Sequence, residues 1–369
     1  MAAVVFEKAS VLCYRLFDVA EAIDLEKARA LAAEESRRLR LTRAGSEYLV
    51  LPNPPLAVGL APRMVPLSFG PMTMEVAVHL FDFGVASVIL KAPVRAGTTM
   101  EELVPLCDEL YDSLEVEKAA VEVLGQMRQA LAPALGEGQL WTQNESYTVV
   151  FAEKLRGEPK AEELLTHGEW LARLLLGEVG ERPLSKKETL DVLEHQFSYT
   201  DLDLAVIDWN AAFVYEPSGS QDIPDLLEIA NAQLLELRFF DDKLDRQLRE
   251  TYTQVARKKR RFSVLRSPYS GLVRRVMVTL FEITEFIERV ENSLKIVGDF
   301  YLAKVYEASV KQLRIGSWQA QVTRKQRLLA QTYSLLKGEV DTNRSHLLEL
   351  TIVVLIILEV VLAFLPWKP

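Results

Sequence analysis

Residues 347–365 read LLELTIVVLIILEVVLAFL, and this apolar run governs how the rest of the chain is interpreted. A helix that crosses a membrane needs about 20 mainly apolar residues, and the run is close to that length. Leucine and β-branched residues cover every face of the expected helix, without the polar stripe of an amphipathic surface helix. The run therefore predicts one C-terminal transmembrane helix over 347–366. The alternative is a buried C-terminal helix of a soluble core.

Two acidic residues interrupt the run. Glu349 lies at its near edge, whereas Glu359 lies close to its centre, where a charge costs about 2.5–3.5 kcal/mol on insertion scales. If the span is real, Glu359 is either a protonated spectator or paired inside a helix assembly, with a second copy or a membrane-protein partner. The residues expected to form the membrane anchor in the lipid bilayer are Leu350, Ile352, Leu355, Glu359, Leu362 and Trp367.

Both ends of the sequence bear on localisation. Few residues follow the run, so we expect insertion after synthesis, a single-pass tail-anchored topology and a body that stays in the cytoplasm. The first residues lack a basic segment followed by an apolar one, so no signal peptide is predicted. The two cysteines, Cys13 and Cys107, are too few for a disulfide framework and indicate reduced thiols.

The composition fits a folded chain of two or three domains. Of 369 residues, 49% are hydrophobic and 26% are charged, which is ordinary for globular proteins. The net charge of −9 argues against a protein built mainly to coat nucleic acid.

Helical spacing dominates from Asp222 onward. We predict one helix from Asp222 to about Phe262, a second from the break at 267–271 to about Leu313, and a third from Trp318 into the apolar run. The short break favours a helical hairpin. Apolar residues at alternating steps of three and four predict a coiled-coil seam. The partner of this seam is either the same chain, as an antiparallel hairpin, or another copy, and we expect a homo-oligomer. In the second helix these residues are Leu280, Ile283, Ile287, Val290, Leu294, Val297 and Tyr301.

Eight basic residues crowd the hairpin region without an intervening acid. They are Arg257, Lys258, Lys259, Arg260, Arg261, Arg266, Arg274 and Arg275. One interpretation is a patch for an anionic partner such as RNA, DNA or anionic lipid. The other is a solvated helix end, whose cations complement the helix dipole.

The N-terminal part alternates irregularly between strand and helix patterns, which is typical of a mixed α+β body. Predicted strands lie at 10–17, 74–80, 85–94, 147–152, 202–207 and 211–215, the last two joined by a turn at Asp208-Trp209-Asn210. Predicted helices lie at 24–39, 98–135, 162–176 and 186–196. The predicted domains are therefore an α+β body over 1–220, a long helical coiled-coil stalk over 221–346 and the transmembrane helix over 347–366.

Motifs that carry chemistry are scarce. The sequence has no HExxH, CxxC, phosphate loop, GxGxxG or GxSxG, so no catalytic residue, cofactor or metal site is predicted. Two weaker possibilities stay open. Glu194 and His195 are a candidate acid–base pair, and the acid clusters Asp201/Asp203 and Asp241/Asp242/Asp245 are candidate divalent-ion sites, with solvated acids as the alternative.

Three strings resemble one family. They are Tyr14–Leu25 (YRLFDVAEAIDL), Phe81–Val85 (FDFGV) and Leu348–Val360 (LELTIVVLIILEV). They are similar to segments of the required-for-meiotic-nuclear-division family, a domain of unknown function in bacteria, fungi and mitochondria. The resemblance implies a membrane-tethered, oligomerising protein without known catalysis. Mitochondrial members are associated with support of organelle translation at the inner membrane.

Three functions compete at this stage. The first is a non-catalytic scaffold or tether that self-associates through stalk and anchor. The second is an enzyme or nucleotide-responsive switch with an unrecognised site in the body. The third is a membrane-tethered RNA-binding protein that uses the basic residues 257–275.

Overall fold

The computed structural model describes residues 3–32, 36–38, 49–50, 53–136, 141, 143–180, 182–257, 270–293, 295–296 and 300–364. The chain divides into two compact units. The first comprises Met1–Phe239 and Arg289–Ser317, and the second comprises Phe240–Glu288 and Trp318–Pro369.

A mixed sheet forms the centre of the first unit. Within the described residues it has nine strands in the order β2-β4-β5-β6-β1-β7-β10-β9-β8. Its strands are β1 (Phe6–Asp18), β2 (Ser36–Arg38), β4 (Leu56–Leu67), β5 (Gly70–Leu80), β6 (Val85–Val94), β7 (Asn144–Leu155), β8 (Gln196–Phe197), β9 (Leu204–Ile207) and β10 (Ala211–Tyr215). A separate two-stranded sheet pairs β3 (Leu49–Val50) with β11 (Lys295–Ile296).

Strand β1 lies in the middle of the sheet. It pairs antiparallel with β6 on one side and with β7 on the other. Val11, Cys13 and Phe17 belong to the main hydrophobic cluster, together with residues of α2 and α3. The alternate residues Leu12 and Tyr14 are also buried but lie outside that cluster. Because successive side chains of a strand point to opposite faces, both faces of the sheet at β1 are covered.

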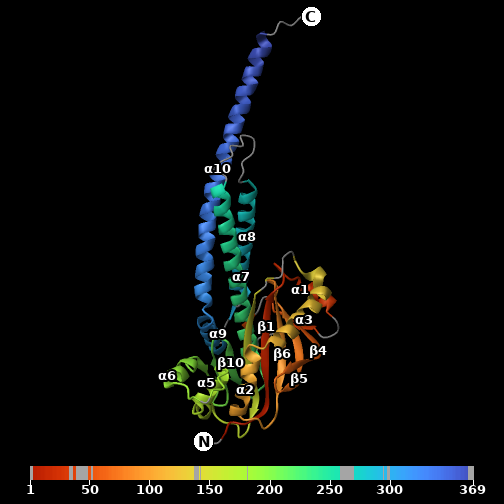
Figure 1. Ribbon diagram of the computed structural model, residues 1–369, viewed down its shortest axis with the longest axis vertical. Helices are drawn as coiled ribbons and strands as arrows, with labels where there is room; N and C mark the ends of the chain where they lie inside the picture. Colours follow the sequence, from red (N-terminus) through yellow and green to blue (C-terminus); the bar gives the residue numbers. More distant parts are fainter. Residues whose placement is uncertain are drawn as a thin grey trace. The chain divides into compact units, whose positions relative to one another are not determined.

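Helix α2 (Met100–Tyr111) packs on β1 and β7, and helix α3 (Leu114–Leu131) packs on β6, β4 and β1 (Figure 1). The predicted helix 98–135 is therefore divided into α2, α3 and a short 3-10 turn, and both helices begin with a side-chain cap. Thr99 accepts a hydrogen bond from the Glu102 amide, and Glu102 accepts one from the Thr99 amide, which completes a capping box. Ser113 caps α3 through the Val116 amide. The helices α1 (Leu25–Leu31), α4 (Ala161–Leu165), α5 (Gly168–Leu176) and α6 (Lys186–Val192), and the 3-10 turn η1 (Ala132–Ala134), also belong to this unit.

The first part of α7 (Asp222–Arg257) supplies cover for the other face. Its residues from Ile223 to Leu237 are all buried, including polar ones. Glu228 contacts His79 of β5, and the side chain of Arg238 forms an ion pair with Glu145 of β7. Helix α9 (Phe300–Gln312) adds to the same unit, where the Tyr306 hydroxyl donates to Gln233.

The predicted α+β body followed by a helical region is confirmed, with corrections to single elements. The predicted helix 162–176 is two helices, α4 and α5, and the predicted helix 186–196 ends at Val192 and leads into β8. Strand β4 was not predicted at all. Pro62 and Pro66 interrupt its apolar pattern and cannot donate to a strand partner.

The second unit contains the end of α7, most of α8 (Ser270–Ser293) and most of α10 (Ile315–Phe364). The predicted second helix, continuous to Leu313, is wrong. Helix α8 ends at Ser293, β11 follows, and α9 begins at Phe300. Leu280 and Ile287 are only half-buried, so the seam of α8 differs from the predicted one.

No helix in the described part of the chain has both the length and the hydropathy that a membrane crossing requires. Helix α10 is described to Phe364, and the side chain of Leu362 and the whole of Trp367 lie outside the described residues. The predicted domain boundaries at 220 and 346 stay a prediction.

The tight turn between β5 and β6 supplies a stability test. Gly84 has φ +105°, and a Cβ there would lie 1.8 Å from the Ala20 carbonyl oxygen. Gly70 has a similar φ of +114° but open space around it. We expect Gly84→Ala to lower the free energy of unfolding by about 3–5 kcal/mol, and Gly70→Ala by only about 1 kcal/mol.

The measurement uses Cys13 and Cys107, which are free and buried in the first unit. Thiol labelling in a urea series on the full chain reports when that unit opens. Equal midpoints for the two glycine variants would contradict the steric argument.

Candidate functional site

The second unit has a regular buried seam. In α8 the buried residues are Leu272, Val276, Thr279, Ile283 and Phe286, at alternating steps of four and three. Helix α7 contributes Phe240, Leu244 and Leu248, and α10 contributes Val322, Leu329 and Leu336. The rings of Phe240 and Phe286 lie 4.7 Å apart between centroids. This spacing is typical of helices that pack along one continuous seam.

A lysine lies within this seam. Lys325 follows Val322 by three residues and precedes Leu329 by four. Its Nζ is 2.7 Å from Oδ1 of both Asp241 and Asp245 on α7, and its side chain is only 15% exposed. Burial lowers the pKa of Lys325, but hydrogen bonds to the two carboxylates outweigh it, and the pKa is raised overall. The lysine therefore stays charged and ties α10 to α7.

The acid cluster suggested as an ion site therefore has another role. Asp241 and Asp245 hold Lys325, and Asp242 lies 3.3 Å from Arg246 on its own helix. Within the described residues, no group of three or more histidine, cysteine, aspartate or glutamate side chains is placed to hold a metal ion.

The apolar stretch of α10 lacks cover. Every described side chain from Leu348 to Val360 is exposed, and its large apolar residues are 50–64% exposed. Leu350, Ile352 and Leu355 belong to this set, and Glu359 is exposed among them. A soluble monomer rarely exposes a contiguous apolar surface of this kind, so the stretch marks an interaction region.

The basic residues predicted to bind an anionic partner fall mostly outside the described residues. Arg274 and Arg275 are exposed on α8. Lys258, Lys259, Arg260, Arg261 and Arg266 lie outside the described part, as does the side chain of Arg257. Binding of RNA, DNA or lipid by this patch stays a prediction.

A buried pair that the sequence did not reveal links β5 to α7. His79 Nδ1 lies 2.7 Å from Glu228 Oε2, and both side chains are almost fully buried. Ser87, opposite His79 on β6, is fully buried, and its Oγ has no hydrogen-bond partner among the described atoms. Burial raises the pKa of nearby Tyr14, and the charges of Glu228 and Asp225 raise it further, so the phenol stays neutral.

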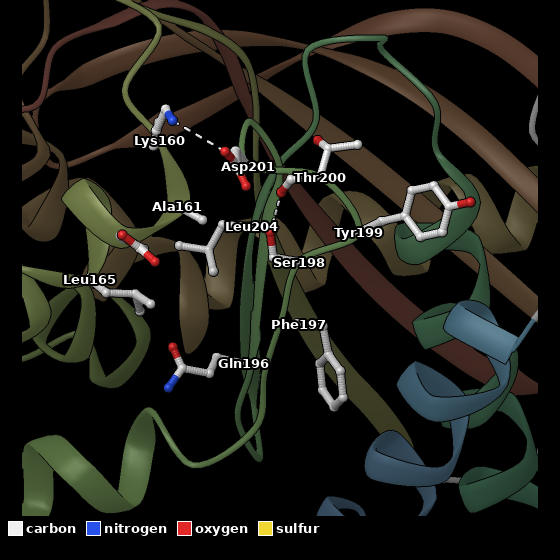
Figure 2. Close-up of a pocket in the computed structure, with 11 residues that line it drawn as sticks. Lys160, Ala161, Leu165, Gln196, Phe197, Ser198, Tyr199, Thr200, Asp201 and Leu204 are labelled. Carbon is white, nitrogen blue, oxygen red and sulfur yellow. Dashed lines mark hydrogen bonds and ion pairs between the residues drawn. The ribbon is translucent and has the colours of Figure 1, made fainter.

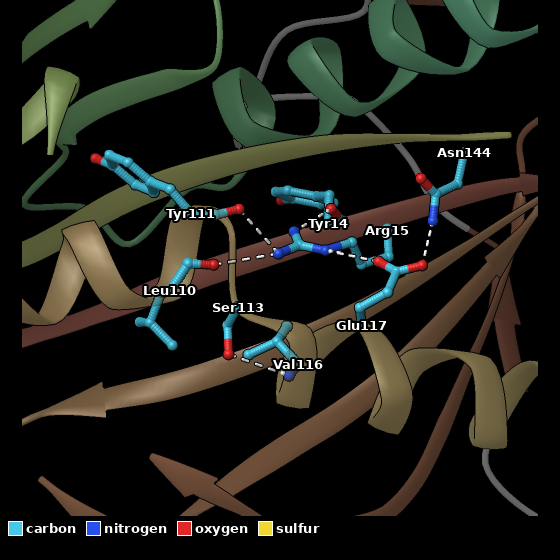
Figure 3. Close-up of polar contacts among 8 residues, drawn as sticks. All are labelled: Tyr14, Arg15, Leu110, Tyr111, Ser113, Val116, Glu117 and Asn144. Carbon is cyan, nitrogen blue, oxygen red and sulfur yellow. Dashed lines mark hydrogen bonds and ion pairs between the residues drawn. The ribbon is translucent and has the colours of Figure 1, made fainter. Parts of the chain in front are cut away.

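Arg15 is the charged residue at the centre of β1 (Figure 3). It donates hydrogen bonds to the carbonyls of Leu110 and Tyr111 at the end of α2, at 3.1 and 3.2 Å. Its Nε lies 3.3 Å from Oε2 of Glu117 on α3, which also accepts from Asn144. The guanidinium thus satisfies orphan carbonyls at a helix end and joins α2, α3 and β1. This network is structural, because Arg15 is 1% exposed.

A surface pocket of about 390 Å³ lies between α4 and β8 (Figure 2). Lys160 and Asp201 pair at one end, at 3.2 Å, and Gln196 lies at the other. Asp203 accepts hydrogen bonds from the amides of Tyr199 and Thr200, both 2.7 Å long. The carboxylates of the Asp201/Asp203 cluster thus organise the loop.

The structure gives the surroundings of Glu194, from the suggested acid–base pair, and of the two thiols. Glu194 lies 3.2 Å from Lys311 and forms an ion pair with it. Burial raises the pKa of Cys13 to about 11 and raises that of Cys107 as well, which leaves two inert thiols.

Comparison with known proteins identifies the family of this chain. The family model described as the N-terminal domain of the uncharacterized protein MJ0711 matches residues 8–222. The chain belongs to this family. The uncharacterized protein MJ0711 of Methanocaldococcus jannaschii is 26% identical over 194 residues, which cover 52% of this chain and 58% of that protein. No solved structure matches.

The matched residues cover most of the first unit, and they overturn the resemblance to the required-for-meiotic-nuclear-division family. The strings behind that resemblance were short and largely apolar. FDFGV reflects a local requirement, since Gly84 takes a positive φ in a tight turn where a Cβ has no room. Such a string recurs wherever two strands need that turn.

Lys325 gives a prediction for the second unit. Lys325→Met leaves Asp241, which is 15% exposed, without its counterion, so we expect local opening of α7 and α10 to become easier by about 2–4 kcal/mol. Lys337→Met removes an exposed charge from the same helix and serves as the matched control. Hydrogen exchange of the full chain measures both. Equal exchange rates in the two variants would show that Lys325 contributes nothing to the stability of α7 and α10 against local opening.

Proposed function

We propose that this protein is a membrane-tethered, non-catalytic scaffold. It presents the α+β body on a helical coiled-coil stalk, and the residues of the apolar run 347–366 insert into a lipid bilayer. The observation that best supports this proposal is the exposure of the side chains of Leu348–Val360 on α10.

The distribution of the exposed residues favours lipid over a protein groove. A partner that docks on one side of a helix needs apolar residues at spacings of three and four. Here Ile352 to Leu358 are consecutive apolar residues, and each is 51–57% exposed. An environment that is apolar on every side of the helix is the interior of a bilayer.

The second unit supports the stalk. Its buried residues have coiled-coil spacing, and Lys325 with Asp241 and Asp245 fixes which turns of α7 and α10 face each other. Copies associate, in this proposal, through the stalk and through Glu359, whose carboxyl group gains a hydrogen-bonding partner within a helix assembly.

A pair of arginine substitutions tests insertion. Leu355→Arg places a charge in the apolar run at a cost of about 2.5–3.5 kcal/mol, whereas Leu328→Arg makes the same change at an exposed site of α10 outside the run. We expect carbonate-resistant membrane association to fall for Leu355→Arg and to stay unchanged for Leu328→Arg.

The same fractions, treated with protease from the cytosolic side, report the orientation of the body. Digestion of the body is the expected result. If both arginine variants and the parent chain remain soluble, the tether proposal fails and a site in the body becomes the leading alternative.

Glu359 tests the association step separately. Glu359→Leu removes the carboxyl group from the run. We expect the oligomer of this variant in mild detergent to dissociate at a protein concentration about tenfold higher than that of the parent chain. Glu349→Leu, at the edge of the run, is the control. A monodisperse monomer of the parent chain would contradict self-association.

A further inference from the structure

Two exposed arginines lie near the start of α8, where the helix itself does not favour them. Arg274 and Arg275 are in the second turn of α8. The dipole of a helix favours cations at its C-terminal end, so at this end it gives the two arginines no stabilisation. The residues three and four positions from each arginine include no acid, so α8 offers them no ion pair along its own surface. Cations that complement a helix dipole are therefore not the explanation for this pair.

The charges of α8 are separated along its length. All its acids lie from Glu282 onward, and Glu282 itself pairs with Lys243 of α7 at 2.7 Å. The first half of the helix therefore carries cations alone. Because the whole chain has a net charge of −9, an anionic surface repels it on average, and a local group of cations is needed for one part of the chain to approach such a surface.

The arginines lie toward the end of the second unit from which the apolar run of α10 extends. The side-chain amide of Gln326 on α10 donates to the Thr284 hydroxyl on α8 at 3.1 Å. Helix α8 ends within the first unit and α10 begins there, so the two helices run in opposite directions (Figure 1). The same number of residues separates Thr284 from Arg274 and Gln326 from Leu336. Arg274 is therefore level with Leu336, near the exposed Lys337.

This level is close to the surface of a bilayer that holds the apolar run. From Leu336 to Leu348 the helix rises about 18 Å, and the headgroup layer takes up about 5–8 Å of that distance. The remainder of about 10 Å is about one Debye length in physiological salt. Long arginine and lysine side chains shorten it further. The cations at this level therefore lie within the negative surface potential of an anionic leaflet.

We propose that Arg274 and Arg275, together with Lys337, bind anionic phospholipid headgroups at the surface of the bilayer that the apolar run enters. This inference rests on the proposed membrane insertion and adds the class of lipid to it. Guanidinium groups pair with phosphate and carboxylate oxygens, which such headgroups present. A groove for single-stranded nucleic acid needs aromatic side chains among its cations, and positions 271–280 of α8 contain none.

A fluorophore beside the arginines measures which lipid gathers there. Gly271→Cys supplies the labelling site, because residue 271 is exposed and a Cβ there meets no atom within 4 Å, while Cys13 and Cys107 are buried. The labelled full chain is placed in phosphatidylcholine vesicles that contain about 30% phosphatidylserine. Energy transfer is then measured to a trace of acyl-labelled phosphatidylserine or of acyl-labelled phosphatidylcholine.

We expect energy transfer to phosphatidylserine to exceed that to phosphatidylcholine about twofold to threefold at low salt, because the cations enrich the anionic lipid around the label. In about 1 M salt the Debye length falls to about 3 Å, and the two values should become equal.

Three double variants assign the preference to these residues. Arg274→Gln with Arg275→Gln should bring the ratio of the two transfer values to about one, whereas Arg274→Lys with Arg275→Lys keeps the charge and most of the preference. Arg324→Gln with Arg327→Gln is the control. It removes the same charge from an exposed part of α10 about two and a half turns further from the apolar run, and should change nothing.

Equal energy transfer to the two lipids in the parent chain overturns the proposal and leaves membrane insertion intact. Transfer to neither lipid means that the apolar run does not enter the bilayer, and the proposed function fails together with this inference. Polyuridylate that binds the parent chain in mild detergent, but not the variant with Arg274→Gln and Arg275→Gln, would assign the cations to RNA and would also overturn the proposal.

Discussion

The burial of both faces of strand β1 is the constraint on which the first unit depends. β1 pairs along its length with β6 and β7, and side chains of both parities are buried. Helices α2 and α3 cover one face, and Arg15 links them to the strand through the last carbonyls of α2. The other face is covered by the start of α7, whose residues as far as Phe239 belong to the first unit. Its buried polar residues follow from this, because Glu228 meets His79 and Arg238 meets Glu145 there.

Helix α7 continues into the second unit, where it packs along a seam with other helices instead of covering a sheet. There Lys325, with Asp241 and Asp245, fixes the register of α10 against α7 more than it adds to the free energy of unfolding. The cost of removing the lysine from water offsets much of its attraction to the two carboxylates. The apolar residues Leu348–Val360 are exposed and form no such seam, and this difference is the basis for proposing lipid as their environment.

Much of this fold can be predicted from sequence where one local signal suffices. The alternation in β5 and β6 and the caps Asp24 and Thr99 all lie within a few residues of the elements they define. Strand β4, near the edge of the sheet, was not predicted because its prolines interrupt the apolar pattern typical of a strand. The polar pairs were missed for a different reason. His79 and Glu228 are 149 residues apart, and the seam position of Lys325 means little until α7 is known to be its neighbour. The resemblance to the required-for-meiotic-nuclear-division family was wrong because short, largely apolar strings reflect amino-acid composition more than common ancestry.

The central claim is that the apolar run of α10 lies in lipid, and spin-label accessibility in liposomes measures it directly. Labels at positions 355 and 328 of the full chain, with Cys13 and Cys107 buried and unreactive, are exposed to oxygen and to a polar nickel chelate. The account predicts that position 355 is relaxed by oxygen and protected from nickel, while position 328 shows the reverse. Equal access of nickel to both positions would contradict it.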